Sequence, residues 1–326
     1  MPDAEAQRVD LVATLERSAV MVLARMPSRS EGAVEVEGRV SLGAGVVLRA
    51  DGLVVTAAHV VIGAAEVAVK VEDQEPAPAR VVFLDVGSDV ALLRLEAPPP
   101  GLVPARLGDS DRVRKGETVY VIGTPSGFER SLSVGVVSGR HPLGHVVGGN
   151  IEVEVIQTDA AVNPGNSGGP IFDSRGRLIA IAQVIVSRGG GSNGLGFGLA
   201  VNVLKKLLAL DPCTWLGFSG IPLSDSMAVA LNVPRGGGVL VQVVTPGSPA
   251  ADAGIVAGKY PVRLAEEQIL LGGDVVLETN GVPFLDWVRT RLTGGRPGER
   301  HEYRLLVLRA GRLLEVPVAA VHRAGW

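Results

Sequence analysis

The stretch Asn163-Pro164-Gly165-Asn166-Ser167-Gly168-Gly169-Pro170 places one serine among three glycines. Glycine adopts backbone conformations that are closed to other residues, so this loop can turn the amides of Gly165 and Ser167 toward one point while the serine hydroxyl projects outward. Two amides aimed at one oxygen form an oxyanion hole, which stabilises the charge that develops during acyl transfer. The stretch therefore predicts a nucleophile, Ser167, beside an oxyanion hole made by Gly165 and Ser167.

Two other segments supply the partners that a nucleophilic serine needs. His59 follows residues 53–57, and Asp89 leads directly into residues 90–95. Both are mainly apolar runs that we expect to be strands. An imidazole can take the proton of the hydroxyl, and a carboxylate can fix the tautomer of the imidazole. Each segment alone also has a structural explanation, as a histidine at a strand end, a turn cap or a plain loop. Their combination, in the order His, Asp, Ser that chymotrypsin has, favours a catalytic triad of His59, Asp89 and Ser167.

The composition indicates a globular chain of more than one domain that is built mainly of strands. A length of 326 residues exceeds what one ordinary core organises, and 46% hydrophobic residues exclude a mainly disordered chain. The 43 glycines and 21 prolines lie between short runs of Val, Ile and Leu, as expected for many short strands joined by turns. A net charge of -3 gives no basic field that would attract nucleic acid.

The single cysteine, Cys213, excludes an internal disulfide and a four-cysteine zinc site. Residues 1–26 have neither the pattern of a signal peptide nor that of a transmembrane span. We therefore expect no transmembrane segment. The protein is cytoplasmic if the chain is complete, or extracytoplasmic if an export segment has been removed.

The strand pattern predicts two β-barrels, at about residues 20–110 and 115–205, followed by a helix over residues 201–210. Pro212 cannot continue that helix, so we expect a domain over 1–211 and a mixed α+β domain over 212–326. Residues 141–145, which include His141 and His145, are expected to form a loop. The two histidines could ligate a metal, but no third ligand is evident, so we expect neither a metal nor another cofactor.

The residues around His59, Asp89 and Ser167, together with residues 157–160 and 194–200, resemble the HtrA (Deg) family of trypsin-like serine proteases. The resemblance spans residues 40–322. It implies a chymotrypsin-like double β-barrel that cuts unfolded or misfolded polypeptides without ATP and assembles as a homotrimer, with an extracytoplasmic or periplasmic location. It also implies that His59 is the general base, that Asp89 orients it and that Ser167 is the nucleophile.

The same resemblance implies that Val162 and Ile185 line the primary specificity pocket. No acidic residue lies in the segments that flank this pocket, so we predict cleavage after small or medium aliphatic residues. A protein that chiefly holds clients, as a chaperone or peptide-binding scaffold with low or gated proteolysis, is the alternative function.

The C-terminal part begins with Trp215-Leu216-Gly217-Phe218, which resembles the carboxylate-binding loop of HtrA-type PDZ domains. A glycine between bulky apolar residues can expose consecutive amides to the carboxylate at the end of a peptide. We therefore expect a PDZ domain that binds peptide C-termini through Trp215, Leu216, Gly217 and Phe218, although a buried strand without a ligand is the other interpretation. Residues 194–197 have a similar pattern, but they precede the helix at 201–210 and are assigned to the specificity pocket.

Overall fold

The computed structural model describes residues 3–27, 29–31, 34–36, 38–146, 151–185, 194–210, 215–234, 237–264, 267–290 and 300–321. The chain forms two compact units, one over Met1–Val146 and Ile151–Leu208 and one over Ala209–Trp326. The boundary expected between residues 211 and 212 falls outside the described residues. Among the described residues, no helix has both the length and the apolar character needed to cross a membrane.

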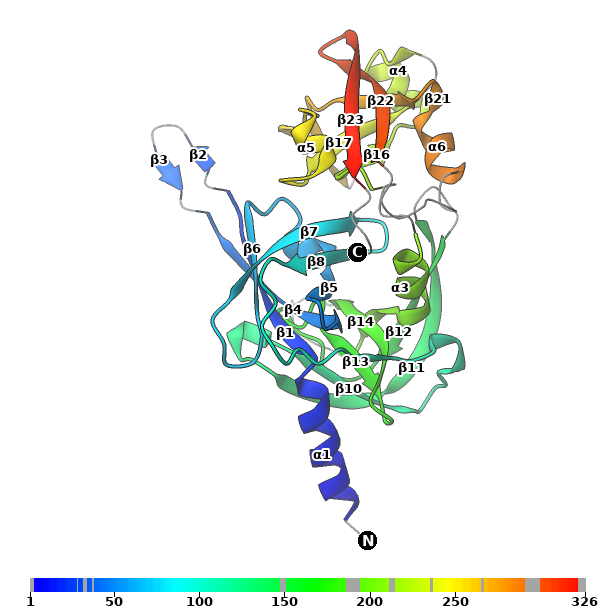
Figure 1. Cartoon of the computed structure of the whole chain (residues 1–326). Coiled ribbons are helices and arrows are strands. Elements are labelled where there is room, and N and C mark those ends of the chain that lie inside the picture. The colour runs from blue at the N-terminus through cyan, green and yellow to red at the C-terminus, as the bar shows by residue number, and fades with distance from the viewer. Residues whose placement is uncertain are drawn as a thin grey trace. The chain divides into compact units, whose positions relative to one another are not determined.

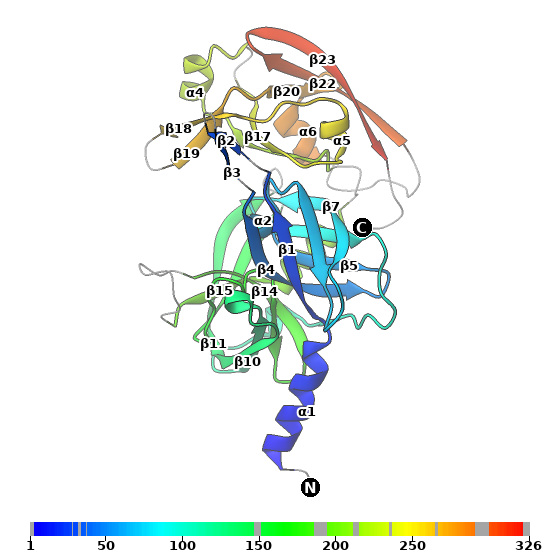
Figure 2. The same cartoon turned by 90° about the vertical axis from the view of Figure 1, so that its left-hand side faces the viewer.

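The first unit begins with a closed antiparallel barrel. Continuous apolar runs explain its centre, because every residue of β5 and most residues of β8 are buried. Figure 2 shows strands of this barrel side by side. Around the barrel the strands follow the order β1 (Ala19–Arg25), β4 (Val40–Arg49), β5 (Leu53–Ala57), β8 (Val90–Leu95), β7 (Ala77–Asp85) and β6 (Glu66–Lys70).

A second barrel follows in the same unit and is closed by the pairing of β13 with β14. The short strand β9 (Arg106–Leu107) joins β14 in parallel. The mainly β class and the two barrels expected from the sequence are thus confirmed. The strands of this barrel are β13 (Pro170–Asp173), β10 (Thr118–Gly123), β11 (Ser131–Val146), β12 (Ile151–Thr158), β15 (Gly196–Ala200) and β14 (Arg177–Ile185).

Strand β11 (Ser131–Val146) continues through residues 141–145, where the sequence predicted a loop, so that prediction is wrong. His141 pairs with Val155 of β12, and His145 pairs with Glu152. Irregularities in the register between Val137 and Gly139 and between Pro142 and Gly144 let the strand bend and continue. A bulge tolerates a proline because the missing N–H falls where the ladder is already interrupted.

Short helices and a hairpin complete the first unit. Helix α1 extends away from the barrels in both views (Figures 1 and 2), with Leu15 buried near its end. The remaining elements are β2 (Arg29–Glu31), β3 (Val34–Val36), α1 (Ala4–Glu16), α2 (Ala58–Val61), the 3₁₀ turns η1 (Ser110–Arg112) and η2 (Pro125–Gly127), and α3 (Val201–Leu208).

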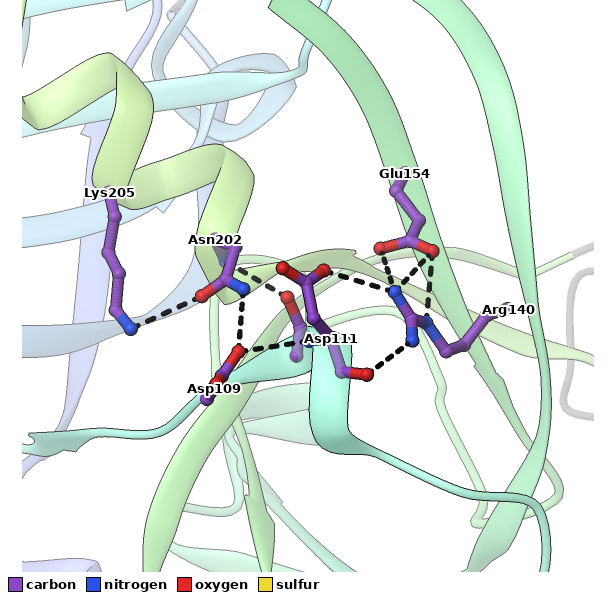
Figure 3. Close-up of polar contacts among 7 residues, drawn as sticks. Asp109, Asp111, Arg140, Glu154, Asn202 and Lys205 are labelled. Atoms are coloured by element: carbon purple, nitrogen blue, oxygen red, sulfur yellow. Dashed lines mark hydrogen bonds and ion pairs between the residues drawn. The ribbon is translucent and has the colours of Figure 1, made fainter.

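A polar network ties η1, which lies in the connection between the barrels, to the second barrel (Figure 3). Arg140 of β11 donates two hydrogen bonds to Glu154 of β12, both of 2.9 Å, and also contacts Asp111. Asn202 of α3 donates to Asp109 at 2.8 Å. The hydrogen bonds with Glu154 raise the pKa of the Arg140 guanidinium, and the hydrogen bond from Asn202 lowers the pKa of Asp109. The connection between the barrels is therefore bonded both to strand β11 and to helix α3.

The second unit is a mixed α+β structure around one antiparallel sheet. Its core packs Trp287 against Phe284 and Tyr303. Strand β16 lies at one edge of the sheet and pairs with β17. The elements are β16 (Phe218–Pro222), α4 (Asp225–Ala230), β17 (Val239–Val244), α5 (Pro249–Asp252), β18 (Tyr260–Leu264), β19 (Glu267–Leu271), β20 (Val275–Thr279), β21 (Val282–Pro283), α6 (Phe284–Thr290), β22 (Arg300–Arg309) and β23 (Arg312–Val321). The separate hairpin of β18 and β19 was not expected from the sequence.

Candidate active site

Strand pairing brings His59 and Asp89 to the same end of the first barrel. Strands β5 and β8 are antiparallel, and Ala57 at the end of β5 lies opposite Val90 at the start of β8. The chain leaves β5 into the short helix α2, which carries His59, while Asp89 is the residue immediately before β8. The residues that follow one strand and precede its antiparallel neighbour meet at one sheet end.

Asp89 makes two hydrogen bonds to His59. The ring Nδ1 lies 2.7 Å from Asp89 Oδ2, and the His59 backbone N–H donates to Asp89 Oδ1 at 2.9 Å. The imidazole is half exposed, at 49%, whereas the carboxylate is 27% exposed. With Nδ1 donating to the carboxylate, the Nε2 atom of the ring is left to accept a proton.

The turn that presents Asp89 has an unusual backbone. Asp89 has a φ of 52°, which is the left-handed region that non-glycine residues seldom adopt. The neighbouring Ser88 donates from its N–H and its hydroxyl to Asp85 Oδ2, at 2.7 and 2.6 Å. Burial raises the pKa of the Asp85 carboxyl above its ordinary value, although these bonds from Ser88 act in the opposite direction.

The loop that carries Ser167 is anchored to both barrels through main-chain bonds. Ala44 of β4 donates to the Ser167 carbonyl at 2.8 Å, and Gly168 donates to the Ala182 carbonyl of β14 at 2.7 Å. Gly168 has a φ of 85°, and a Cβ there would collide with Ala44 O and Thr56 Oγ1. Only glycine fits this position without moving the first barrel.

The Ser167 side chain faces the same cleft as His59 and Asp89. Its hydroxyl donates to the backbone carbonyl of Gln183 at 3.1 Å. The cleft has a volume of about 440 Å³ and opens between the loops of the two barrels. It is lined by His59, Val86, Asp89, Val162, Asn163, Pro164, Ser167 and Gln183.

The expected oxyanion amides lie in a loop whose shape requires glycine. Gly165 has a φ of 104°, and a Cβ there would collide with the carbonyl of Thr124. The N–H and the hydroxyl of Thr124 both donate to the Gly165 carbonyl, at 3.2 and 3.0 Å. In the part of the chain that the structure describes, no acceptor contacts the N–H of Gly165 or of Ser167. Both amides are therefore available to an oxygen from outside.

Of the two residues expected to line the specificity pocket, the structure describes the side chain of Val162 only. Val162 is buried and lines the cleft, and a Cβ at Gly196 would come within 2.7 Å of its side chain. Asp159, the acidic residue nearest in sequence, accepts the N–H of Val136 at 2.7 Å. Ile185 ends β14, but its side chain lies outside the described residues.

One residue at the cleft, Gln183, was not singled out from the sequence. Its buried side chain donates from Nε2 to the carbonyls of Ser88 and Asp89. No local pattern marks a glutamine within an apolar strand as part of a site. The one signal in the sequence was a single polar residue in the otherwise apolar run of residues 178–185, which predicts a buried polar side chain and no particular role.

The second unit contains the residues expected to hold a peptide carboxylate. Leu216 is buried, Gly217 has a φ of 88°, and Phe218 starts the edge strand β16 and packs against Phe284 of α6. Ser248 stabilises this loop, because its hydroxyl donates a hydrogen bond to the Gly217 carbonyl at 3.1 Å. The structure thus places a tight glycine turn directly before the edge strand β16.

Within the described ranges, no group of three or more His, Cys, Asp or Glu side chains is arranged to hold a metal ion. The side chain of His145 lies outside those ranges. His141, the other histidine considered as a ligand, contacts Gln157 through Nε2 at 2.9 Å.

Comparison with known proteins agrees with this geometry. Residues 43–181 match the family described as trypsin-like peptidase domain. A probable periplasmic serine endoprotease DegP-like from Ectopseudomonas mendocina is 35% identical over 309 residues, or 92% of this chain and 60% of the relative. A protein of the same description from Halomonas elongata is 34% identical over 90% of this chain and 58% of the relative. The chain therefore spans somewhat more than half the length of these relatives.

Solved structures show the same likeness over nearly the whole chain. A structure described as HtrA-type protease AlgW with decapeptide has a TM-score of 0.54 and 26% sequence identity, and covers 97% of this chain and 98% of that chain. A second, described as the same protease with tripeptide, has a TM-score of 0.54 and 28% identity over 97% of each chain.

Proposed function

Because the chain belongs to the family of DegP-like, HtrA-type serine endoproteases, we propose that it is a serine endopeptidase that hydrolyses unfolded or misfolded polypeptides without ATP. The observation that carries the proposal is the 2.7 Å contact of His59 Nδ1 with Asp89 Oδ2 at a cleft that Ser167 also lines. These three groups are the ones that amide hydrolysis by a serine requires.

In this mechanism Asp89 holds the imidazole tautomer whose Nε2 accepts the proton of the Ser167 hydroxyl. The hydroxyl would have to turn from the Gln183 carbonyl toward that nitrogen before it attacks the substrate carbonyl. The developing oxyanion would then accept hydrogen bonds from the N–H groups of Gly165 and Ser167. Neither N–H group has another acceptor in the described structure. The imidazolium next to Asp89 returns its proton to the leaving amine as the C–N bond breaks. A water that is deprotonated by the same Nε2 then attacks the acyl-enzyme, and the proton returns to Ser167 as the acid product leaves.

We propose that Val162 and Ile185 shape the primary specificity pocket and favour small or medium aliphatic residues. The buried apolar side chain of Val162 supports this preference, because it offers a basic side chain neither a charge nor a hydrogen-bond acceptor. Peptides that differ only in the residue before the scissile bond test the preference. We expect at least about 10-fold higher kcat/KM for valine or alanine than for lysine or arginine.

For the second unit we propose a PDZ domain that binds peptide C-termini through Trp215, Leu216, Gly217 and Phe218. The support is the glycine turn at Gly217 beside the edge strand β16, to which an extended peptide could add as another strand.

By likeness to the family we also propose a homotrimer, which sedimentation velocity would test. The periplasmic relatives favour an extracytoplasmic location.

The test of the enzymatic proposal is Ser167→Ala. We expect cleavage of an unfolded protein such as casein to fall by about 10⁴- to 10⁶-fold, because the nucleophile is gone while the fold loses one hydroxyl. Ser174→Ala is the matched control, since Ser174 is exposed and lies seven residues further along the same segment. Equal digestion by wild type and Ser167→Ala would disprove the mechanism. Binding of casein without cleavage by wild type would favour the alternative, a chaperone or peptide-binding scaffold.

A further inference from the structure

Gln183 lies at a break in the ladder between β14 and β15. The pairing shifts between Ala182 and Val184, so Gln183 is the extra residue of a bulge. A bulge turns the side chain and the carbonyl of its extra residue away from the regular directions of the strand. Here Gln183 lines the cleft and is 8% exposed, and its carbonyl is directed at the Ser167 hydroxyl.

The side-chain amide of Gln183 holds the turn that presents Asp89. Its Nε2 donates to the carbonyl of Ser88 and, at 3.2 Å, to that of Asp89. These contacts join the second barrel, which carries Gln183, to the first barrel, which carries the turn. They also reach the backbone at the point where Asp89 has its left-handed φ of 52°, a conformation that persists only where surrounding contacts impose it.

The turn is also held by contacts within the first barrel, which differ in kind from the contact of Gln183. The Asp89 N–H donates to the Val86 carbonyl at 3.2 Å. Asp85 accepts both bonds from Ser88 within the first barrel, so that contact sets the local shape of the turn. Gln183 instead sets where the turn stands relative to the second barrel. Because the Ser167 hydroxyl bonds to the main-chain carbonyl of the same Gln183, one residue contacts both the serine and the turn that carries Asp89.

The chemistry of the contact demands a donor. A primary amide offers two N–H groups, which match two carbonyl oxygens that lie close together. A hydrocarbon side chain of similar length would leave both carbonyls without this donor, and a carboxylate would place a negative charge against them. The Asp89 carbonyl also accepts the Ala58 N–H at 3.1 Å, so the loss of the amide would fall mainly on the Ser88 carbonyl.

We infer that Gln183 is a positioning residue, whose side-chain amide sets the place of Asp89, and through it of the His59 imidazole, relative to Ser167. The inference rests on the triad proposed above. It adds a fourth side chain on which the alignment of the three groups depends.

The test is Gln183→Met, which keeps the length of the side chain and removes the donors. We expect kcat/KM on an unfolded substrate or a short peptide to fall by about 10- to 100-fold, mainly in kcat, as for a misplacement of about 1 Å. The matched control is Gln242→Met in the second unit, because Gln242 also bonds to backbone, through Nε2 to the Leu270 carbonyl at 2.9 Å. We expect that control to keep the hydrolytic rate.

The pH profile separates positioning from general destabilisation. In Gln183→Met the carboxylate of Asp89 is less well placed to stabilise the imidazolium, so the acid limb of kcat/KM should move to lower pH. Gln183→Glu puts a second negative charge near the imidazole, so its acid limb should move to higher pH. Asp85, the other carboxylate at this turn, is unchanged in both variants. A residue that only supports the fold would leave the acid limb of Gln183→Met in place. The added charge of Gln183→Glu acts on the imidazole in either case, so this variant serves to scale an electrostatic shift.

The outcomes distinguish this inference from the proposed function. If Ser167→Ala abolishes cleavage while Gln183→Met keeps the wild-type rate and acid limb, the positioning role is wrong and the protease proposal stands. If Gln183→Met fails to fold, Gln183→Asn carries the test, because it keeps the charge at zero and shortens the side chain by one carbon. The inference is wrong if Gln183→Asn folds and keeps the wild-type kcat and acid limb.

Discussion

The serine loop of the first unit and the loop of residues 215–218 in the second unit are both tight glycine turns, but they are held in different ways. Gly168 and Gly217 have nearly the same φ, 85° and 88°. A Cβ at Gly168 would meet Ala44 O and the Ala57 nitrogen, which belong to the backbone of the first barrel, together with the Thr56 hydroxyl. A Cβ at Gly217 would meet a single side chain, Ser248.

This difference follows from what each turn is proposed to do. The serine loop must hold a hydroxyl and two amides within tenths of an ångström of a reacting carbonyl, so support by the backbone of two barrels suits it. A turn that receives a peptide carboxylate recognises a terminal group and tolerates a softer support. The two turns should therefore respond differently to the same substitution.

Gly168→Ala should have the largest effect. The added methyl group meets backbone that cannot move without opening the first barrel, and the left-handed φ adds strain. We expect a loss of more than about 4 kcal/mol in the free energy of unfolding, or expulsion of the serine loop with loss of cleavage. Thermal unfolding and casein digestion measure both. Gly116→Ala is the control, because Gly116 has a φ of 87° and open space around it, so only about 1 kcal/mol should be lost.

Gly217→Ala should have a smaller effect that a second substitution can relieve. We expect a loss of about 2 to 4 kcal/mol, seen as faster hydrogen exchange in β16, and weaker binding of C-terminal peptides, with the serine loop unaffected. Adding Ser248→Gly removes the atom that the new methyl group meets and should recover part of the loss. No recovery, together with an effect as large as that of Gly168→Ala, would contradict the distinction between the two turns. Gly254→Ala, with a φ of 73° and open space, is the control.

Ser248→Ala should have the smallest effect of the three. It removes the hydrogen bond to the Gly217 carbonyl and the N-cap contact at 3.3 Å that the hydroxyl accepts from the Ala251 N–H. We expect a loss of about 1 to 2 kcal/mol and a modest loss of peptide affinity. Ser224→Ala provides the comparison, because Ser224 caps α4 in the same way without a bond to the 215–218 loop. Ser224→Ala should leave peptide affinity unchanged. Equal losses of peptide affinity in both variants would show that Ser248 does not stabilise the 215–218 loop.

Much of the strand pattern could be predicted because it depends on residues that are close together in the sequence. Strands β5 and β8 are short apolar runs bounded by turn residues, and both were predicted with the ends that the structure gives them. Strand β11 was underestimated because Pro142 and two glycines read as a loop, whereas the partner strand β12 keeps them extended across two irregularities. The β18 and β19 hairpin was missed for the related reason that its residues show no strict alternation.

The sequence by itself determined the mainly β class, the two barrels and the candidates His59, Asp89 and Ser167, since apolar runs, glycines and reactive side chains are local properties. Tertiary structure alone decided that the Gln183 amide reaches the Asp89 turn and that the Ser167 hydroxyl rests on the Gln183 carbonyl. Those contacts join positions 94 and 16 residues apart, through a bulge whose position depends on the register of two strands. Register is set by the packing of whole barrels, and no short stretch of residues encodes it.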